Sequence, residues 1–291
     1  MKTIGVIGLG SIGMRHAKNL QAMGYDVRGY DPDKKKRLES SWTIDEVLDS
    51  DAIVIASPTK NHFHHLHVVL SEEKPAFIEK PISNEMIGLS HEVGAKLMVG
   101  YNLRFHSCVK KAKEWLDAGL IGRPLWANFT CAQYNDKPAY MRDGVILNWS
   151  HEIDLALYLL GNASVSASST RLTDGKDDMT DILLTHDNGC KSSVHLDYIT
   201  QHPPNDRHFI IQGTKTRITA DLDARRIFVG RNDLFEGGTQ AFGDSFDENY
   251  VEEMQAFIDR IDGKKTIGCT GAEALKVLEI CLEVRKQAGL V

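Results

Sequence analysis

The chain has 291 residues, of which 42% are hydrophobic and 25% charged, and its formal net charge at pH 7 is −6. This length favours two domains, and the composition is ordinary for a soluble globular protein. The negative charge gives no electrostatic footprint for nucleic acid or an anionic membrane, so neither is an expected partner. No apolar run approaches the roughly 18 residues of a membrane span, and the amino terminus has no signal-peptide pattern. We therefore expect a cytoplasmic protein.

Short apolar runs alternate with helix-like segments in the first hundred residues. This alternation is typical of a parallel sheet covered by helices. The predicted strands are 4–8, 27–30, 52–56, 76–79 and 96–99, and the predicted helices are 14–23, 44–48 and 62–70.

The pattern changes after Gly100, where segments of alternating polarity predict antiparallel strands. The hairpin turn predicted at Asp187-Asn188-Gly189 supports this, because Asn and Gly accept the positive φ of tight turns. A second candidate turn is Gln212-Gly213-Thr214-Lys215. The predicted strands include 125–131, 164–172 and 182–185, and the predicted helices are 107–118, 151–160, 248–261 and 272–287.

Three glycines directly follow the first predicted strand, in the run Gly8-Leu9-Gly10-Ser11-Ile12-Gly13. Gly8 and Gly10 permit a tight turn and the close approach of a pyrophosphate, whose charge meets the N–H groups of the helix start at Ser11 and Ile12. Gly13 allows the helix to pack closely on the strand. In this context the run predicts a dinucleotide site rather than an ordinary glycine turn.

Asp31 follows the second predicted strand. An acidic side chain there accepts hydrogen bonds from both ribose hydroxyls and repels a 2′-phosphate, which favours NAD over NADP. NADP stays open as an alternative, because three lysines and an arginine at positions 34–37 can offset that repulsion. Helix capping by Asp31 is a second interpretation, and it does not exclude ribose binding.

Ser57-Pro58-Thr59 follows the third predicted strand, at the edge of the sheet where ligands of such folds collect. The histidines at 62, 64, 65 and 67 raise the question of a metal ion. On a helix, however, His62 and His65 face differently from His64 and His67, and no nearby carboxylate or cysteine completes a ligand set. We predict no metal site here and assign His62 alone to the cofactor side.

At Phe77-Ile78-Glu79-Lys80-Pro81 the chain resembles the Gfo/Idh/MocA family of dehydrogenases, in which a Glu-Lys-Pro triplet follows a strand. Other motifs occur in the family's order and approximate spacing, namely 8–13, 58–59, 100–105 and 148–154. The resemblance implies an α/β Rossmann-like dinucleotide-binding domain, which we place at residues 1–103. It also implies an α+β domain with a large, mainly antiparallel open sheet at residues 104–291, for substrate binding and oligomerisation.

The resemblance further implies a nicotinamide cofactor in a cleft between the domains, with Glu79 and Lys80 beside it. By position, Lys80 matches the family's active-site lysine and His151 its catalytic histidine. Oxidising a secondary alcohol sends a hydride to nicotinamide and a proton to a base, and histidine titrates near neutral pH. The ammonium of Lys80 can stabilise the developing alkoxide, and Asp154 can orient His151 or hold a substrate hydroxyl.

Four further residues are predicted to bind substrate. Tyr101, Asn102 and Arg104 follow the strand at 96–99 and would face the cleft, where Arg104 suits a carboxylate or phosphate; interdomain packing is the alternative. Asn148 stands where many relatives carry an acid. Because asparagine forms hydrogen bonds but cannot accept a proton, the substrate or the proton route here can differ from the family's.

By resemblance, the function is that of an NAD(H)-dependent oxidoreductase that transfers a hydride to or from a hydroxyl-bearing carbon of a sugar, sugar acid or nucleotide sugar. Two alternatives stay open: a reductase of a non-sugar such as an imine or bilin, and a catalytically silent NAD-binding regulator. The presence of both Lys80 and His151 speaks against the regulator. We expect a homodimer or homotetramer formed through the second-domain sheet, because helices cover only one of its faces.

Overall fold

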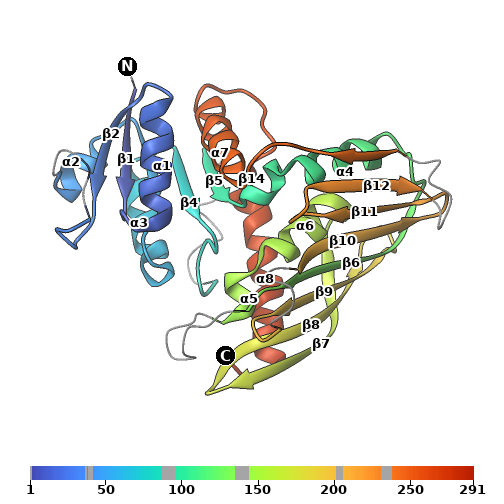
Figure 1. The fold of residues 1–291 in the computed structure, drawn as a ribbon. Coiled ribbons are helices and arrows are strands. Elements are labelled where there is room, and N and C mark those ends of the chain that lie inside the picture. The colour runs from blue at the N-terminus through green and yellow to red at the C-terminus, as the bar shows by residue number, and fades with distance from the viewer. Residues whose placement is uncertain are drawn as a thin grey trace. The chain divides into compact units, whose positions relative to one another are not determined.

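The computed structural model describes residues 2–36, 38, 42–86, 96–134, 144–200, 206–230 and 238–291. The chain divides into two compact units, each with its own sheet (Figure 1). The first unit comprises Met1–Phe105 and Ser245–Leu278, and the second comprises His106–Asp244 and Glu279–Val291. No helix in the described part of the chain is both long and apolar enough to cross a membrane.

The sheet of the first unit has six strands in the order β14-β5-β4-β3-β1-β2, with only β14 running antiparallel to its neighbour. The strands are β1 Thr3–Ile7, β2 Asp26–Tyr30, β3 Ala52–Ile55, β4 Ala76–Glu79, β5 Leu97–Gly100 and β14 Cys269–Thr270. Since β1 pairs with both β2 and β3, the strand order reverses at β1. Ligands of such sheets bind where the order reverses, at the carboxyl ends of the strands. This topology confirms the predicted Rossmann-like class.

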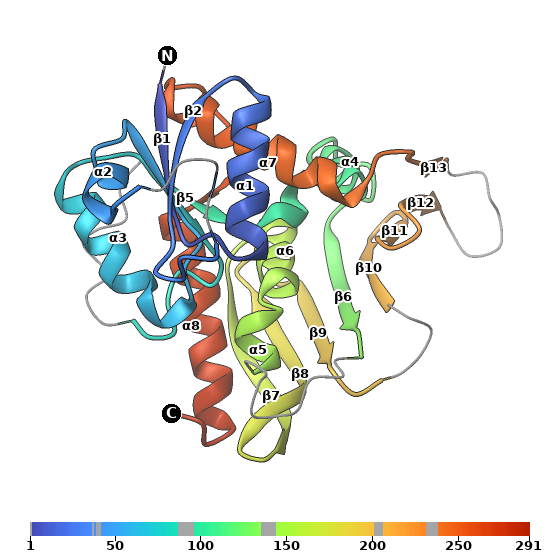
Figure 2. The same ribbon diagram turned by 60° about the vertical axis from the view of Figure 1, so that its left-hand side comes forward.

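Helices and short 3-10 turns connect these strands (Figure 2). They are α1 Ser11–Ala22, α2 Ile44–Leu48, η1 Thr59–Asn61, α3 His62–Ser71, η3 Asn102–Phe105, α7 Phe246–Ile261 and the first part of α8 Gly271–Gln287. The bounds of α2 and of β4 coincide with the predicted ones.

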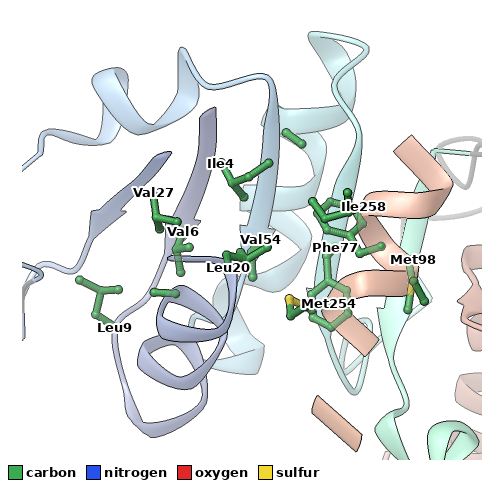
Figure 3. Packing of buried hydrophobic residues seen from close by; sticks show 14 of the residues in the cluster. Ile4, Val6, Leu9, Leu20, Val27, Val54, Phe77, Met98, Met254 and Ile258 are labelled. Atoms are coloured by element: carbon green, nitrogen blue, oxygen red, sulfur yellow. The ribbon is translucent and has the colours of Figure 1, made fainter. Parts of the chain in front are cut away.

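The core of the first unit includes a helix from late in the chain. Figure 3 shows Met254 and Ile258 of α7 beside Phe77 of β4, within one buried apolar cluster. The predicted division at residue 103 assigned this helix to the second domain, whereas the structure packs it with the first unit. An amphipathic sequence shows that one helix face must be buried, but not which sheet will bury it.

The second unit is built on an eight-stranded sheet of order β13-β12-β11-β10-β6-β9-β8-β7. Only the pair β6–β9 is parallel, which confirms the predicted, mainly antiparallel sheet. The strands are β6 Pro124–Ala132, β7 Ala163–Thr173, β8 Lys176–His186, β9 Lys191–Asp197, β10 Asp206–Gly213, β11 Arg217–Asp221, β12 Arg226–Gly230 and β13 Thr239–Ala241.

Helices α4 Ser107–Asp117, α5 Val145–Asn148 and α6 His151–Leu160 pack on this sheet. The predicted hairpin turn lies between β8 and β9, where Gly189 has a φ of 83°. Helix α6 begins and ends at the predicted residues, and Gly161 closes it with a φ of 90°. The start of this helix is set by contacts described below.

Candidate active site

The glycine turn of the first unit joins β1 to α1. Gly8 has a φ of 92°, which side-chain-bearing residues rarely adopt. A Cβ atom on Gly13 would lie 1.9 Å from the Gly8 carbonyl oxygen, so only glycine lets the helix approach the turn this closely. A Cβ atom on Gly10, in contrast, would meet no atom within 4 Å. The space beside Gly10 is therefore open to a ligand.

The start of α1 suits an anion. Gly10 is the N-cap residue, no side chain caps the helix, and its first turn contains no acidic residue. Ser11 and Ile12 lie in this turn, so their N–H groups carry the positive end of the helix dipole. The turn and the helix start together fit the pyrophosphate of a dinucleotide.

Asp31 lies directly after β2 and is tied to the glycine turn. Its Oδ2 accepts a hydrogen bond from the Leu9 N–H at 2.8 Å, and its Oδ1 accepts one from the Asp33 N–H at 2.9 Å. These bonds fix the carboxylate beside the turn, and each oxygen keeps capacity for a further donor. Asp31 does not cap a helix, because no helix begins at this position among the described residues. Its bond to the Asp33 N–H stabilises a local turn instead.

The segment after β3 is held by a buried histidine. His62 Nδ1 lies 2.8 Å from the Pro81 carbonyl oxygen, and Nε2 lies 2.8 Å from that of Ser57. Burial lowers the pKa of His62, while the two carbonyls and the charge of Glu79 oppose this effect. The ring therefore connects the loop after β3 to the turn after β4. Thr59 opens the short turn η1 rather than capping α3, whose N-cap residue is Asn61.

Glu79 ends β4, and Lys80 follows in a bend before Pro81. The Glu79 carboxylate is directed into the unit, with Oε1 2.7 Å from His16 Nε2 and Oε2 accepting the Lys80 N–H at 3.2 Å. Both Glu79 and Lys80 are half-buried. The turn that contains Lys80, called the lysine turn below, is thus held by Glu79 through the Lys80 N–H and by His62 through the Pro81 carbonyl oxygen.

Tyr101, Asn102 and Arg104 follow β5 and are each only 2% exposed. Arg104 Nη1 donates to Glu273 Oε1 at 3.0 Å, and this charge pair lowers the pKa of the Glu273 carboxyl against the opposing effect of burial. The sequence predicted that Arg104 binds a carboxylate or phosphate of the substrate. In this structure its partner is a carboxylate of the protein itself, that of Glu273. All three side chains are thus enclosed by protein.

In the second unit, Asn148 ends α5 and His151 begins α6. The Asn148 side-chain amide donates to the hydroxyl of Tyr198, whose ring meets Trp149 edge-on at 4.3 Å. His151 is half-buried, and Asp154, one turn further along α6, is fully buried. Asn148 is thus engaged through its amide group with a buried phenol.

The sequence did not reveal how the start of α6 is anchored. Glu152, next to His151, is 1% exposed and binds Arg207 of β10 through two oxygens, at 2.7 Å to Nε and 3.2 Å to Nη2. Burial works against the Arg207 charge, but the Glu152 carboxylate more than offsets it and raises the pKa of Arg207. No local signal links residues 152 and 207, because β10 meets α6 only through the tertiary fold.

Two family models match the chain. The GFO/IDH/MocA C-terminal domain matches residues 109–219, and the NAD binding domain of D-isomer specific 2-hydroxyacid dehydrogenases matches residues 1–69. The first of these ranges lies within the second unit, and the second range lies within the first unit.

Among curated proteins, the myo-inositol 2-dehydrogenase of Thermotoga maritima is 25% identical, over 97% of this chain and 95% of its own. The UDP-N-acetylglucosamine 3-dehydrogenase of Acidithiobacillus ferrooxidans is 23% identical, with the same coverage of both chains. Among solved structures, a levoglucosan dehydrogenase in complex with NADH superposes with a TM-score of 0.88 at 18% identity, covering 99% of this chain and 97% of that one. This structural likeness shows a common fold. The matching domain model and the full-length relatives confirm the resemblance of this chain to the Gfo/Idh/MocA family of oxidoreductases.

Proposed function

We propose that this protein is an NAD(H)-dependent oxidoreductase that transfers a hydride to or from a hydroxyl-bearing carbon of a sugar, sugar acid or nucleotide sugar. The observation that carries the proposal is the glycine turn. It has free space beside Gly10, packs tightly against the helix at Gly13 and is hydrogen-bonded to the Asp31 carboxylate. The relatives support the substrate class, because they are named as dehydrogenases of an inositol and of a nucleotide sugar.

In this proposal the first unit holds the dinucleotide. The pyrophosphate lies at Gly8 to Gly13 and the start of α1, and the Asp31 carboxylate accepts hydrogen bonds from the ribose. The loop at Ser57 to Thr59 and the turn at Glu79 and Lys80 complete the cofactor side, with His62 holding both in place. When bound, NAD supplies the hydride acceptor, and the protein supplies position and charge.

Lys80 and His151 are the proposed catalytic residues. The Lys80 ammonium donates a hydrogen bond to the reacting oxygen, and the His151 imidazole accepts its proton in the oxidation direction. Asp154 and Asn148 are proposed to position His151 and the substrate. Since Asn148 is neutral and donates to Tyr198, the proton passes to His151 rather than to residue 148.

Tyr101, Asn102 and Arg104 keep their proposed place in the substrate-binding set as its buried support, with Arg104 held by Glu273. This part of the proposal is testable by substitution at Tyr101. Tyr101→Phe should raise the KM for the sugar with little effect on NADH affinity if the hydroxyl contacts substrate, and should change neither value if the ring only packs.

We also propose a cytoplasmic homodimer or homotetramer. The strand register places Trp126 and Leu183 on one face of the eight-stranded sheet, where they are 43% and 44% exposed. Large apolar side chains exposed on a sheet face suit association between copies. All five cysteines are buried free thiols, as expected in a reducing compartment. Sedimentation of the wild type and of Leu183→Glu tests the assembly, and a monomeric wild type would contradict it.

The function is tested by incubating the protein with NAD, or separately with NADP, and a panel of inositols, free sugars, sugar acids and nucleotide sugars. The absorbance of the reduced cofactor reports turnover. We expect reduction of NAD with at least one member of the panel and weaker use of NADP. If the protein binds NADH but neither oxidises any member nor reduces the matching ketones, the proposal is wrong.

A further inference from the structure

Three titratable side chains from separate elements of the first unit lie close together beside the lysine turn. They are His16 of α1, Glu79 of β4 and Glu253 of α7, and one polar atom of each lies within 4.8 Å of the others. His16 and Glu253 are 0% exposed, and the Glu79 side chain is 14% exposed. We call this set the buried triad. The helix after the glycine turn, the Glu-Lys-Pro motif and the late helix α7 each contribute one member.

The triad is bonded directly to the backbone of Lys80. Glu79 Oε1 lies 2.7 Å from His16 Nε2, while its Oε2 accepts the Lys80 N–H at 3.2 Å. The imidazole and the lysine backbone therefore hold the two oxygens of one carboxylate. A change in the charge or position of Glu79 is passed to Lys80 through a single hydrogen bond.

The surroundings of the triad are largely aromatic. The His16 ring meets Phe77 edge-on at 5.1 Å and Tyr250 at 5.9 Å. Burial, together with the charges of Glu79 and Glu253, raises the pKa of Tyr250 to about 12, so this phenol stays protonated at neutral pH. Tyr250 therefore adds no negative charge to this region at neutral pH.

Four other charged or titratable groups face this region. From α1, the Arg15 guanidinium lies 4.6 Å from the centre of the Tyr250 ring and pairs with Asp247 of α7 at 3.4 Å. From the loops, Lys80 and the buried His62 interact electrostatically with each other, and His62 also interacts with Glu79.

We propose that His16 is a positioning residue for Lys80, which acts by holding the Glu79 carboxylate that binds the Lys80 backbone N–H. This inference rests on the proposed function only in taking Lys80 as the catalytic lysine. Loss of the His16 contact frees the Glu79 carboxylate and releases the turn that contains Lys80.

The positioning role is tested with paired substitutions at residue 16. His16→Leu removes the partner of Glu79, and we expect kcat to fall at least about tenfold, because small displacements of a catalytic group are costly. His16→Gln keeps an N–H donor and should recover most of that loss. NADH affinity should stay within about threefold in both variants, which separates a misplaced lysine from a lost cofactor site. The matched control His64→Gln replaces an exposed histidine of the same unit and should leave kcat unchanged.

The outcomes at residue 16 are decisive in either direction. An unchanged kcat in His16→Leu overturns the proposal, and so does a His16→Gln variant that is as slow as His16→Leu although its thermal unfolding matches that of the wild type. If His16→Leu fails to fold, His16→Asn, whose shorter amide side chain reaches less far towards Glu79, replaces it in the same comparison.

The bond to Lys80 is tested without substrate by NMR of the Lys80 backbone amide, which donates to Glu79. We expect the chemical shift of this amide to move in His16→Leu and to return towards the wild-type value in His16→Gln. The control Glu252→Gln removes an exposed carboxylate from α7 and should leave the amide shift unchanged. An identical Lys80 amide shift in His16→Leu and the wild type overturns the proposal.

The NMR measurement requires no substrate, so the two proposals fail separately. Absence of sugar turnover in the wild type would contradict the proposed function, while the Lys80 amide shift still tests the positioning role of His16. Normal turnover with an amide shift that His16→Leu leaves unaltered would contradict the positioning role alone.

Discussion

The two units hold the residues of their proposed sites in different ways. In the first unit, side chains bond to the backbone of neighbouring loops, as Asp31 does to Leu9 and His62 does to Ser57 and Pro81. In the second unit, the helix that begins at His151 is fixed by a buried ion pair between Glu152 and β10. Backbone contacts lie within or beside the sequence motifs, whereas the ion pair joins distant segments. The first arrangement is therefore readable from sequence and the second is not.

The largest effect should come from breaking that ion pair. Glu152→Gln leaves Arg207 buried without its counter-charge, and we expect the free energy of unfolding to fall by about 3–5 kcal/mol. Urea unfolding measures this loss. The double variant Glu152→Met with Arg207→Met should recover most of it, because no isolated charge remains. If the single variant loses under about 1 kcal/mol, the anchor assigned to α6 is wrong.

A second test in the same unit concerns pH. His106 precedes α4, with Nδ1 accepting the Cys108 N–H and Nε2 bonded to the Leu222 carbonyl oxygen. Burial, assisted by the Arg225 charge, lowers its pKa to about 4. Because the unfolded chain binds the proton more tightly, stability is retained above about pH 6.5 and is lost as pH falls towards 4, by about 3 kcal/mol.

The pH effect is measured as the free energy of unfolding across that window. His106→Gln should flatten the dependence, whereas replacing the exposed His64 by glutamine should preserve the wild-type slope. Equal slopes in the wild type and His106→Gln would show that His106 does not titrate as described.

Glycine substitutions sharpen the description of the first unit. Gly13→Ala brings a Cβ to 1.9 Å from the Gly8 carbonyl oxygen, and we expect a loss of about 2 kcal/mol in stability. Gly10→Ala meets no atom within 4 Å, so stability should be unchanged while NADH affinity falls. Calorimetry of binding and thermal unfolding separate the two effects. Similar behaviour of the two variants would contradict the distinction between a packing glycine and a ligand-facing one.

The smallest effect concerns cofactor choice. Asp31→Asn removes the charge that repels a 2′-phosphate, and we expect the ratio of NAD to NADP affinity to fall about tenfold, or about 1.4 kcal/mol. The control Asp33→Asn removes a neighbouring exposed carboxylate and should alter the ratio little. A ratio unchanged by Asp31→Asn would remove this residue from the cofactor site.

The features that the sequence predicted correctly depend on short-range rules. The strand 76–79 and the helix 151–160 have the predicted bounds, because apolar periodicity and a terminal glycine define them locally. The tight approach at Gly13 follows from motif spacing.

Other features depend on contacts between segments far apart in the chain. The short strand β14 pairs with β5, and α7 joins the core of the first unit. The pairing of His16 with Glu79 and Glu253, like that of Glu152 with Arg207, becomes visible only when the sheets are assembled. A polar residue in an amphipathic helix has the same sequence signature whether it faces solvent or a buried partner.

The central claim is that Lys80 and His151 carry the proton and charge movements of hydride transfer. Its most direct test is kcat with the sugar selected from the panel, for the wild type, Lys80→Met and His151→Asn, each first checked for native thermal unfolding. We predict a fall of at least about 100-fold in each variant, the loss expected when a general acid–base group is removed. Turnover within a few-fold of the wild type in both variants would contradict the account.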